Sequence, residues 1–500
     1  GTQRIEFYFF GHAHTAGDTF AYLPKHKLVC TGDACVNGAF NFMGHSDSAS
    51  WIRSLERAQQ LDVKWVLPGH GPIAGKDLLE TQKRYFVELR KQVQKGIDAN
   101  QSLAEIQKSI DMPWYKEWTT VKPSAVNVEH VYGELTGRVK AWDLEEDLGI
   151  VEGGPSPTKD TPGWTKPRRI VIPDVMPARL AELKRVAPDI EFIPVKNAAD
   201  AAKNVEDADA VIGFCSADIV KNGKKVRWIQ TAHAGVEDDL SPELVASQIT
   251  LTNLQRVHGP NTADHAFALL LALSRNLRPD MLATRPTARR LPADPDGKES
   301  DRPGADKPGT DQLEARQELH GKTMLVVGLG GLGTEVARRA RAFGMRVMAI
   351  DPKEMERPAF VFSLDQPGKL MELLPNADVV VLACPLTAET RGLIGAEQFK
   401  AMKKNAYVIN VARGGVIKTD DLVAALQQKQ IAGAGLDVTD PEPLGRTHLL
   451  LRLSNCVISP HVAGQSPEVK GRQWRLWREN VRRFVAGEPL LCVVDKAKGY

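Results

Sequence analysis

A glycine-rich turn between a short apolar run and a helical pattern constrains the fold of this 500-residue chain more than any other feature. Met324–Val327 is apolar and β-prone, and the letters GLGGLG follow at Gly328–Gly333. After the turn, Val336, Ala340 and Phe343 recur at helical spacing. A lone GxGxxG is a weak signal. Here a strand precedes it and a helix follows it, which predicts the βα unit that binds a dinucleotide pyrophosphate.

Each glycine of this turn has a separate expected role. Gly328 permits the tight turn, Gly330 lets the backbone approach a pyrophosphate, and Gly333 allows the helix to pack closely. The free N–H groups at the start of the helix would face the phosphates. A glycine-rich turn in some other kind of βα unit is the alternative interpretation.

The residue after the next strand bears on which dinucleotide binds. The run Arg346–Ile350 is followed by Asp351. A carboxylate there accepts hydrogen bonds from the adenosine ribose hydroxyls and repels a 2′-phosphate, so it favours NAD over NADP. Lys353 lies close enough in the sequence to soften that preference.

Composition narrows the classes of partner. Lys and Arg number 65 and Asp and Glu 62, a near balance that argues against a nucleic-acid or polybasic membrane-binding surface. No run of about 18 apolar residues is present, so the sequence predicts no membrane span. The 6 cysteines lack CxxC spacing, which favours reduced thiols and a cytoplasmic setting. Because the chain begins at Gly1 without a leader pattern, we expect residues to be missing before it.

Two polar stretches divide the chain. Gly154–Lys166 reads GPSPTKDTPGWTK and is expected to be a linker. Before it, short strand-like runs precede a long helical stretch from about Lys76 to Ser109. After it, apolar runs alternate with helical patterns in the βα rhythm of a parallel sheet. The second polar stretch, Arg285–Thr310, interrupts that rhythm and is expected to be a surface loop or disordered insert without a function.

Three segments further along place an Arg, a Glu and a His in loops after apolar runs. Arg413 follows one run, Glu442 the next, and His461 the third. In an open α/β sheet, loops at the carboxyl ends of the strands share one crevice, so these side chains could meet beside the cofactor.

These residue types match the needs of 2-oxo acid reduction. Arg413 suits binding of a carboxylate through its bidentate fork. His461 suits proton transfer to the developing alkoxide, and Glu442 would orient the ring and stabilise its charge. Taken singly, an Arg is usually a surface group and a His is more often structural, so the order and spacing of the three carry the interpretation.

With these motifs, the chain from about Arg169 to Lys496 resembles the D-isomer-specific 2-hydroxyacid dehydrogenase family. The resemblance rests on the glycine turn and on four further motifs, each in a separate segment: CPLTAETRGLI at Cys384–Ile394, INVARGG at Ile409–Gly415, AGAGLDVTDPEPL at Ala432–Leu444 and SPHVAG at Ser459–Gly464. A chance match at all five is very improbable.

The resemblance implies an α/β architecture in which a Rossmann-type cofactor domain, residues 319–464, is inserted in a flavodoxin-like substrate domain. The substrate domain would comprise residues 169–277 and 465–500, after a linker at 151–168, with an insert or hinge at 278–318. Two long helices, Thr262–Leu277 and Ser466–Phe484, would cross between the domains.

The family's roles fall on matching positions of this sequence. The resemblance implies that Arg413 binds substrate, that Glu442 and His461 relay the proton, and that Asp437 contacts the nicotinamide amide. The backbone near Ala234 and Gly235 would bind the substrate carboxylate, whereas His258 and His265 are expected to be structural. Leu332 and Pro385 are expected to contact the cofactor. A homodimer is expected.

The sequence departs from the family pattern in two places. Glu237 stands where the family commonly has Asp, which is conservative. The insert Arg285–Thr310 replaces a shorter segment near the hinge and puts the closure dynamics in doubt.

The N-terminal part carries a different resemblance. GHAHTAGDT at Gly11–Thr19, TGDA at Thr31–Ala34 and LPGHGP at Leu67–Pro72 resemble the later motifs of the metallo-β-lactamase fold, over about residues 5–76. The resemblance implies zinc ligands at His14, Asp33 and His70, in a domain expected to span residues 1–150. The family's earlier HxHxDH motif is absent from this sequence, so a remnant without metal is an equal alternative.

Three functions follow from these features. The first is an NAD-dependent dehydrogenase that interconverts a small 2-oxo acid and a D-2-hydroxy acid. The second is a metal-dependent hydrolase acting through the N-terminal segment, which zinc content and ester hydrolysis would reveal. The third is a non-catalytic NAD(H)-sensing protein, which turnover would exclude.

Overall fold

The computed structural model describes residues 3–15, 17–38, 42–43, 46–99, 101–118, 125–136, 150, 156–277 and 316–500. The chain divides into two compact units. The first unit comprises Gly1–Gln230, Gln248–Thr252 and Arg472–Val493, and the second Thr231–Ser247, Asn253–Gly471 and Val494–Tyr500. Among the described helices, none has the length and apolar character needed to cross a bilayer. The predicted insert Arg285–Thr310 lies outside the described residues.

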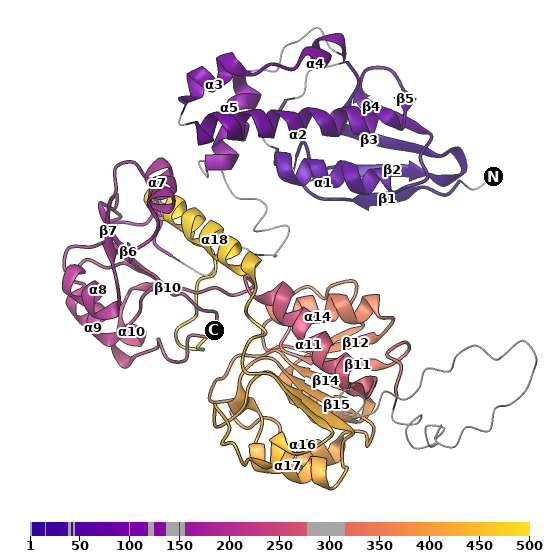
Figure 1. Cartoon of the computed structure of the whole chain (residues 1–500), viewed down its shortest axis with the longest axis vertical. Helices are drawn as coiled ribbons and strands as arrows, with labels where there is room; N and C mark the ends of the chain where they lie inside the picture. Colours follow the sequence, from indigo (N-terminus) through magenta and orange to yellow (C-terminus); the bar gives the residue numbers. More distant parts are fainter. Residues whose placement is uncertain are drawn as a thin grey trace, which may run out of the picture. The chain divides into compact units, whose positions relative to one another are not determined.

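The N-terminal part of the first unit is a mixed five-stranded sheet in the order β1-β2-β3-β4-β5. Its elements are β1 (Glu6–Phe9), β2 (Thr19–Leu23), β3 (Leu28–Val36), α1 (Ser48–Gln59), β4 (Trp65–His70), β5 (Ala74–Gly75), α2 (Asp77–Asp98), α3 (Leu103–Ser109), α4 (Pro113–Trp118) and α5 (Ala125–Thr136). Figure 1 shows α1 and α2 running alongside this sheet. The ring centroids of Trp51 in α1 and Phe86 in α2 lie 4.2 Å apart, with the rings tilted by 33°. Both residues belong to the core that the helices share with Val29 and Val66. The resemblance of this part to the metallo-β-lactamase fold stays a prediction.

The helix predicted over residues 76–109 is two helices, α2 and α3. The break follows from Ser102, which starts α3 with a capping box: its hydroxyl accepts from the Glu105 N–H, and the Glu105 carboxylate accepts from the Ser102 N–H. Such a cap satisfies N–H groups at the start of a new helix and so favours a helix that begins here.

The face of this sheet opposite the core is apolar and exposed. Strand alternation places Tyr8 and Val66 in the core, so their neighbours in sequence project from the other face. Phe7, Phe9, Trp65 and Leu67 are accordingly all exposed.

The second sheet of the first unit is parallel throughout, in the order β10-β9-β8-β6-β7. If the five strands are numbered 1 to 5 along the chain and the sheet is read from β7, the order is 2-1-3-4-5. This is the flavodoxin-like order. The elements are β6 (Arg169–Pro173), α7 (Pro177–Val186), β7 (Glu191–Val195), α8 (Ala198–Asn204), β8 (Ala210–Ile212), α9 (Ala217–Asn222), β9 (Trp228–Gln230), α10 (Pro242–Ala246) and β10 (Thr250–Thr252).

The second unit contains a parallel seven-stranded sheet in the order β13-β12-β11-β14-β15-β16-β17. Its order of appearance, 3-2-1-4-5-6-7, is the Rossmann order with one added strand. The elements are α11 (Gly259–Ser274), β11 (Thr323–Val327), α14 (Gly331–Ala342), β12 (Arg346–Ile350), β13 (Ser363–Asp365), α15 (Leu370–Leu373), β14 (Val379–Leu382), α16 (Ala396–Ala401), β15 (Tyr407–Asn410), α17 (Thr419–Gln427), β16 (Gly433–Leu436) and β17 (Cys456–Ile458). The βα rhythm of the sequence correctly predicted parallel sheets.

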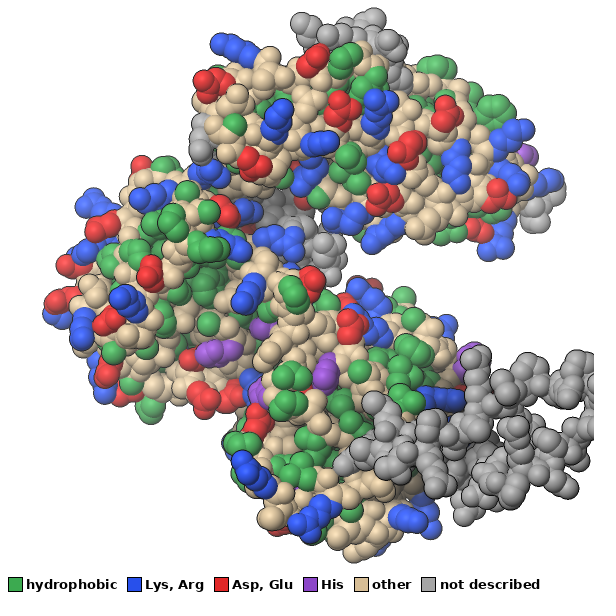
Figure 2. All heavy atoms as spheres, viewed as in Figure 1, with side chains coloured by type: hydrophobic (Ala, Val, Ile, Leu, Met, Phe, Trp, Pro, Cys, Tyr) green, Lys and Arg blue, Asp and Glu red, His purple; other side chains and the backbone are tan. Residues whose placement is uncertain are grey.

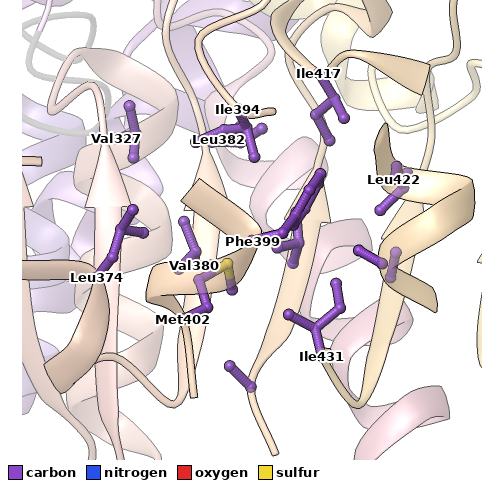
Figure 3. Packing of buried hydrophobic residues seen from close by; sticks show 14 of the residues in the cluster. Val327, Leu374, Val380, Leu382, Ile394, Phe399, Met402, Ile417, Leu422 and Ile431 are labelled. Atoms are coloured by element: carbon purple, nitrogen blue, oxygen red, sulfur yellow. The ribbon is translucent and has the colours of Figure 1, made fainter. Parts of the chain in front are cut away.

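Apolar side chains fill both faces of this sheet. On one face, Val380 and Leu382 of β14 pack with Phe399 of α16 and Leu422 of α17 (Figure 3). On the other, Val379 and Val381 pack with residues of α11 and α14. A sheet buried on both faces explains the continuous apolar runs in the sequence.

The two long predicted helices are present with shifted bounds. The first is α11, whose apolar side packs on α14 and on the sheet of the second unit. The second is α18 (Pro467–Ala486). The domain boundaries inferred from the sequence stay a prediction.

Charged side chains of both signs are interspersed on the face of the molecule shown in Figure 2. This matches the near balance of basic and acidic residues in the sequence.

Candidate functional site

The glycine turn has the backbone geometry expected of a dinucleotide-binding turn. Gly328 has a φ of 92°, and a Cβ there would lie 2.9 Å from the Cys384 backbone. A Cβ on Gly333 would lie 1.8 Å from the Gly328 carbonyl oxygen. At Gly330 a Cβ would meet nothing within 4 Å, so this position opens toward the space that a pyrophosphate would fill. The residues present therefore fit a dinucleotide.

Asp351 is held in place by the turn itself. Its carboxylate is buried and accepts from the Leu329 N–H at 2.7 Å and the Lys353 N–H at 2.8 Å. The acidic group thus lies next to the glycine turn at the end of β12, where ribose hydroxyls bind in such folds.

A cavity of about 1130 Å³ in the second unit contains the turn and most of the predicted site residues. Predicted residues that line it are Ala234, Gly235, Gly328, Gly330, Leu332, Asp351, Pro385, Arg413, Asp437 and His461. The C-terminal residues Lys496–Tyr500 also line the cavity, and the sequence did not predict that they would. Cys384 lines the cavity too, and burial raises the pKa of its thiol to about 12.

Arg413 is fixed by the loop that follows β15 and by Glu237. Asn410 at the strand end shapes this loop, donating to the Arg413 carbonyl and accepting from the Ala412 N–H. The guanidinium donates through Nε to the Glu237 carboxylate and through Nη1 to the Ala412 carbonyl. A Cβ on Gly235 would lie 2.0 Å from Nη2, so the third nitrogen faces the Gly235 backbone.

His461 and Glu442 form a pair on the loops after β17 and β16. The Nδ1 atom of His461 lies 2.6 Å from Glu442 Oε1, and both side chains are partly exposed. Nε2 has no partner in the part of the chain that the structure describes, which leaves it available to a ligand. His461 has a φ of 52°, the left-handed region that side chains other than glycine rarely adopt and that recurs at functional sites.

Asp437 holds the loop that carries His461. Its buried carboxylate accepts from Ser459 Oγ at 2.7 Å and from the Val462 and Ala463 N–H groups. The two histidines expected to be structural hold the same loop: His265 contacts Ser459 Oγ, and His258 contacts the Gly464 carbonyl. Asp437 therefore positions the loop, besides lining the cavity.

His233, which lines the same cavity, forms a second histidine–carboxylate pair with Asp239. The His233 Nε2 atom is 2.8 Å from Oδ2 of Asp239, which is buried, and the His233 side chain is 55% exposed. The sequence could have indicated His233 as a site residue, because it directly precedes Ala234 and Gly235, which were expected to bind the substrate carboxylate.

The predicted zinc ligands do not form a three-ligand site. Asp33 Oδ1 and His70 Nε2 lie 3.3 Å apart, and both side chains are exposed. His14 instead packs edge-on against Trp51, with ring centroids 5.8 Å apart. Within the described residues, no group of three His, Cys, Asp or Glu side chains could hold a metal ion. The structure thus brings together two of the three predicted ligands.

Comparisons with known proteins identify the family of the chain. The family model for the D-isomer specific 2-hydroxyacid dehydrogenase NAD-binding domain matches residues 298–463. The glyoxylate reductase of Korarchaeum cryptofilum is 34% identical over 291 residues, which is 57% of this chain and 82% of that protein.

Solved structures of the family have the same fold. A D-isomer specific 2-hydroxyacid dehydrogenase family protein from Aeromonas salmonicida is 26% identical, with a TM-score of 0.52, over 66% of this chain and 99% of that one. An NADPH-dependent glyoxylate/hydroxypyruvate reductase from Sinorhizobium meliloti, solved with NADP and sulfate, shares the fold at 23% identity and a TM-score of 0.53, covering 67% of this chain and all of that one. The chain therefore belongs to the D-isomer specific 2-hydroxyacid dehydrogenase family and is an NAD(P)-dependent oxidoreductase of 2-oxo and 2-hydroxy acids.

Proposed function

We propose that this chain uses NAD(H) to interconvert a small 2-oxo acid and the matching D-2-hydroxy acid. The observation that carries the proposal is the convergence of Arg413 and the Glu442–His461 pair at the cavity that contains the glycine turn. Reduction at C2 needs a cation for the substrate carboxylate, a proton donor for the oxygen at C2, and a hydride.

The substrate carboxylate would bind between Arg413 and the loop at Ala234–Gly235. Nη2 of Arg413 faces that backbone. The N–H groups of Ala234 and Gly235 donate to no other group within the described residues. A carboxylate placed there accepts charge-assisted hydrogen bonds from both sides, which fixes the position of C2.

His461 would transfer the proton. With Nδ1 bonded to Glu442, Nε2 faces the ligand and can donate a proton to the C2 oxygen during reduction. In the oxidation direction the same nitrogen takes the proton from the hydroxyl. Glu442 sets the orientation of the ring, and so which nitrogen carries the transferred proton.

The bound dinucleotide supplies or accepts the hydride at C2. Asp351 supports NAD over NADP, because its buried carboxylate stands where a 2′-phosphate would bring further negative charge. In the direction of reduction, a 2-oxo acid, NADH and one proton give the 2-hydroxy acid and NAD⁺.

Steady-state turnover tests the proposal. Glyoxylate is the first substrate to try, because the relative from K. cryptofilum is a glyoxylate reductase. Pyruvate, hydroxypyruvate and phenylpyruvate extend the panel, each with NADH and with NADPH, followed by absorbance of the reduced nicotinamide. We expect turnover of at least one acid with NADH. Glycolate from glyoxylate is achiral, so the stereochemistry is read from the products of the other three acids, which should be the D-isomers. Absence of turnover across the panel would contradict the proposal.

A further inference from the structure

His233 lies beside the substrate-binding loop and contributes to the wall of the cavity. It directly precedes Ala234 and Gly235, so its Cα is about 3.8 Å from that of Ala234. A group that lies beyond C2 of a bound 2-oxo acid is therefore within reach of its ring.

The contacts of His233 leave one nitrogen for a ligand. Nε2 is bonded to Asp239, whose carboxylate is only 7% exposed. Within the described residues, Nδ1 has no hydrogen-bond partner. A buried histidine has its ring nitrogens bonded. More than half of the His233 side chain is exposed, so its second nitrogen is accessible to a ligand.

The surroundings favour the charged form of the ring. The hydrogen bond that His233 donates to Asp239 raises the pKa of the imidazole, and burial opposes this shift. The charges of Asp239 and Glu237 raise the pKa further, while Arg413 lowers it. An imidazolium there is a donor with a positive charge aimed at the cavity.

Two lysines also line the cavity. The ammonium of Lys496 donates to the Leu244 and Ser247 carbonyls. That of Lys498 lies 3.3 Å from the Asp495 carboxylate. The tail that carries these lysines lies against the substrate loop, because a Cβ on Gly499 would be 3.7 Å from Leu240 Cδ1.

We infer that His233 is a specificity-determining residue that binds a second anionic group on the substrate, carried on the carbon next to C2. The inference rests on the proposed function and narrows its substrate to 2-oxo acids with a second carboxylate or a phosphate. The C1 carboxylate stays with Arg413 and the Ala234–Gly235 backbone. His233 touches neither C2 nor the transferred proton.

The test compares matched substrates. Oxaloacetate carries a second carboxylate, and 2-oxobutyrate is its counterpart with the C1 carboxylate alone. 3-Phosphohydroxypyruvate and hydroxypyruvate form the same kind of pair for phosphate. For each pair, kcat/KM is measured with saturating NADH, and the readout is the ratio of the charged member, which has the second anionic group, to the member without it. The pair with the larger ratio identifies the anion as carboxylate or phosphate. Glyoxylate turnover, which needs no second anion, reports on the proposed function separately.

His233→Gln keeps the size of the side chain and removes its charge. We expect the ratio for the preferred pair to fall about 10- to 100-fold, the worth of a charge-assisted hydrogen bond, with glyoxylate turnover changed less than about threefold. His233→Lys restores a cation and should recover most of the ratio. His320→Gln is the matched control, because His320 is exposed and does not line the cavity.

The pH dependence of the ratio is a second readout. The imidazolium is present below the raised pKa of His233, so the ratio should be high at acidic pH and fall as pH rises through that value. In His233→Gln the ratio for the oxaloacetate and 2-oxobutyrate pair should not vary with pH. The phosphate pair is not used for this readout, because a phosphate monoester itself has a second pKa of about 6.

Two results would overturn the inference while leaving the dehydrogenase assignment intact. One is glyoxylate turnover by the unmodified chain with no preference for the charged member of either pair. The other is a preference that His233→Gln leaves unchanged within about threefold. Failure of all 2-oxo acids, glyoxylate included, would instead contradict the proposed function.

Discussion

The Nδ1 atom of His461 lies 2.6 Å from the Glu442 carboxylate, across loops that follow two neighbouring strands. The parallel register between β16 and β17, with Leu436 opposite Ile458, brings the two loops to the same edge of the sheet. Because Glu442 engages Nδ1, the ring can present only Nε2 to a ligand.

His461→Gln should lower kcat for 2-oxo acid reduction by about two to four powers of ten, because it removes the proton donor. NADH affinity should be nearly unchanged, since the glycine turn and Asp351 remain. Steady-state kinetics measure kcat, and a fluorescence titration with NADH measures the affinity for the cofactor. A variant that keeps most of its turnover would show that His461 is not the donor.

Asp437→Asn should affect both stability and turnover. Oδ1 accepts from the Ser459 hydroxyl and the Val462 N–H, and Oδ2 accepts from the Ala463 N–H. Asparagine replaces one of these oxygens with an NH2 group that only donates, so at least one of the three donors loses its acceptor. We expect a loss of about 1–3 kcal/mol in unfolding free energy and a lower kcat, because the loop that carries His461 is released. Denaturant melts and kinetics check this. Unchanged stability would contradict the role assigned to Asp437.

Local patterns were enough to predict the parallel sheets and the three loops that carry Arg413, Glu442 and His461. Each of these residues follows an apolar strand, and the carboxyl ends of parallel strands share one edge. The roles of Gly328, Gly330 and Gly333 were also readable, because such turns use glycine for backbone reasons that depend on few neighbours.

Contacts between distant segments could not be predicted. Glu237 and Arg413 are 176 positions apart, and nothing in either motif indicates that their charges meet. The His233–Asp239 pair lies in an irregular loop, where no periodic pattern indicates which side chains face each other. The predicted zinc ligands also depend on contacts between segments. Asp33 and His70 meet across the adjacent strands β3 and β4, whereas His14 packs against Trp51.

Asp351→Ala should narrow the preference for NADH over NADPH. The substitution removes the acceptor for the ribose hydroxyls and the charge that repels a 2′-phosphate. We expect KM for NADH to rise about 10-fold or more and KM for NADPH to fall or stay constant. Kinetics with both cofactors provide the measurement. If the unmodified chain used NADH and NADPH equally well, Asp351 would not have the role in cofactor preference that is assigned to it.

Metal analysis should find substoichiometric zinc in the purified chain. Two ligands from Asp33 and His70 are fewer than the three that a catalytic zinc needs. Chelators should leave 2-oxo acid reduction intact, because Arg413 and His461 supply the charge and the proton. Stoichiometric zinc that is lost in His70→Ala would show that a metal site forms after all.

Gly235→Ala should weaken substrate binding while leaving the fold intact. The added Cβ would lie 2.0 Å from Arg413 Nη2 and 2.5 Å from Glu237 Oε2, closer than any real contact. Both neighbours are ends of long side chains, so they can move aside at little cost in stability. Moving the guanidinium takes away the cation that fixes the substrate carboxylate.

We therefore expect KM for the 2-oxo acid to rise about 10-fold or more in Gly235→Ala, with KM for NADH and the melting temperature nearly constant. Gly445→Ala is the matched control, since a Cβ there meets nothing within 4 Å and the residue does not line the cavity. If Gly235→Ala left KM for the 2-oxo acid at the control's value, the carboxylate would have to bind elsewhere, and Arg413 would lose its assigned role. A large drop in melting temperature would instead show that the Arg413–Glu237 pair supports the fold as well as the site.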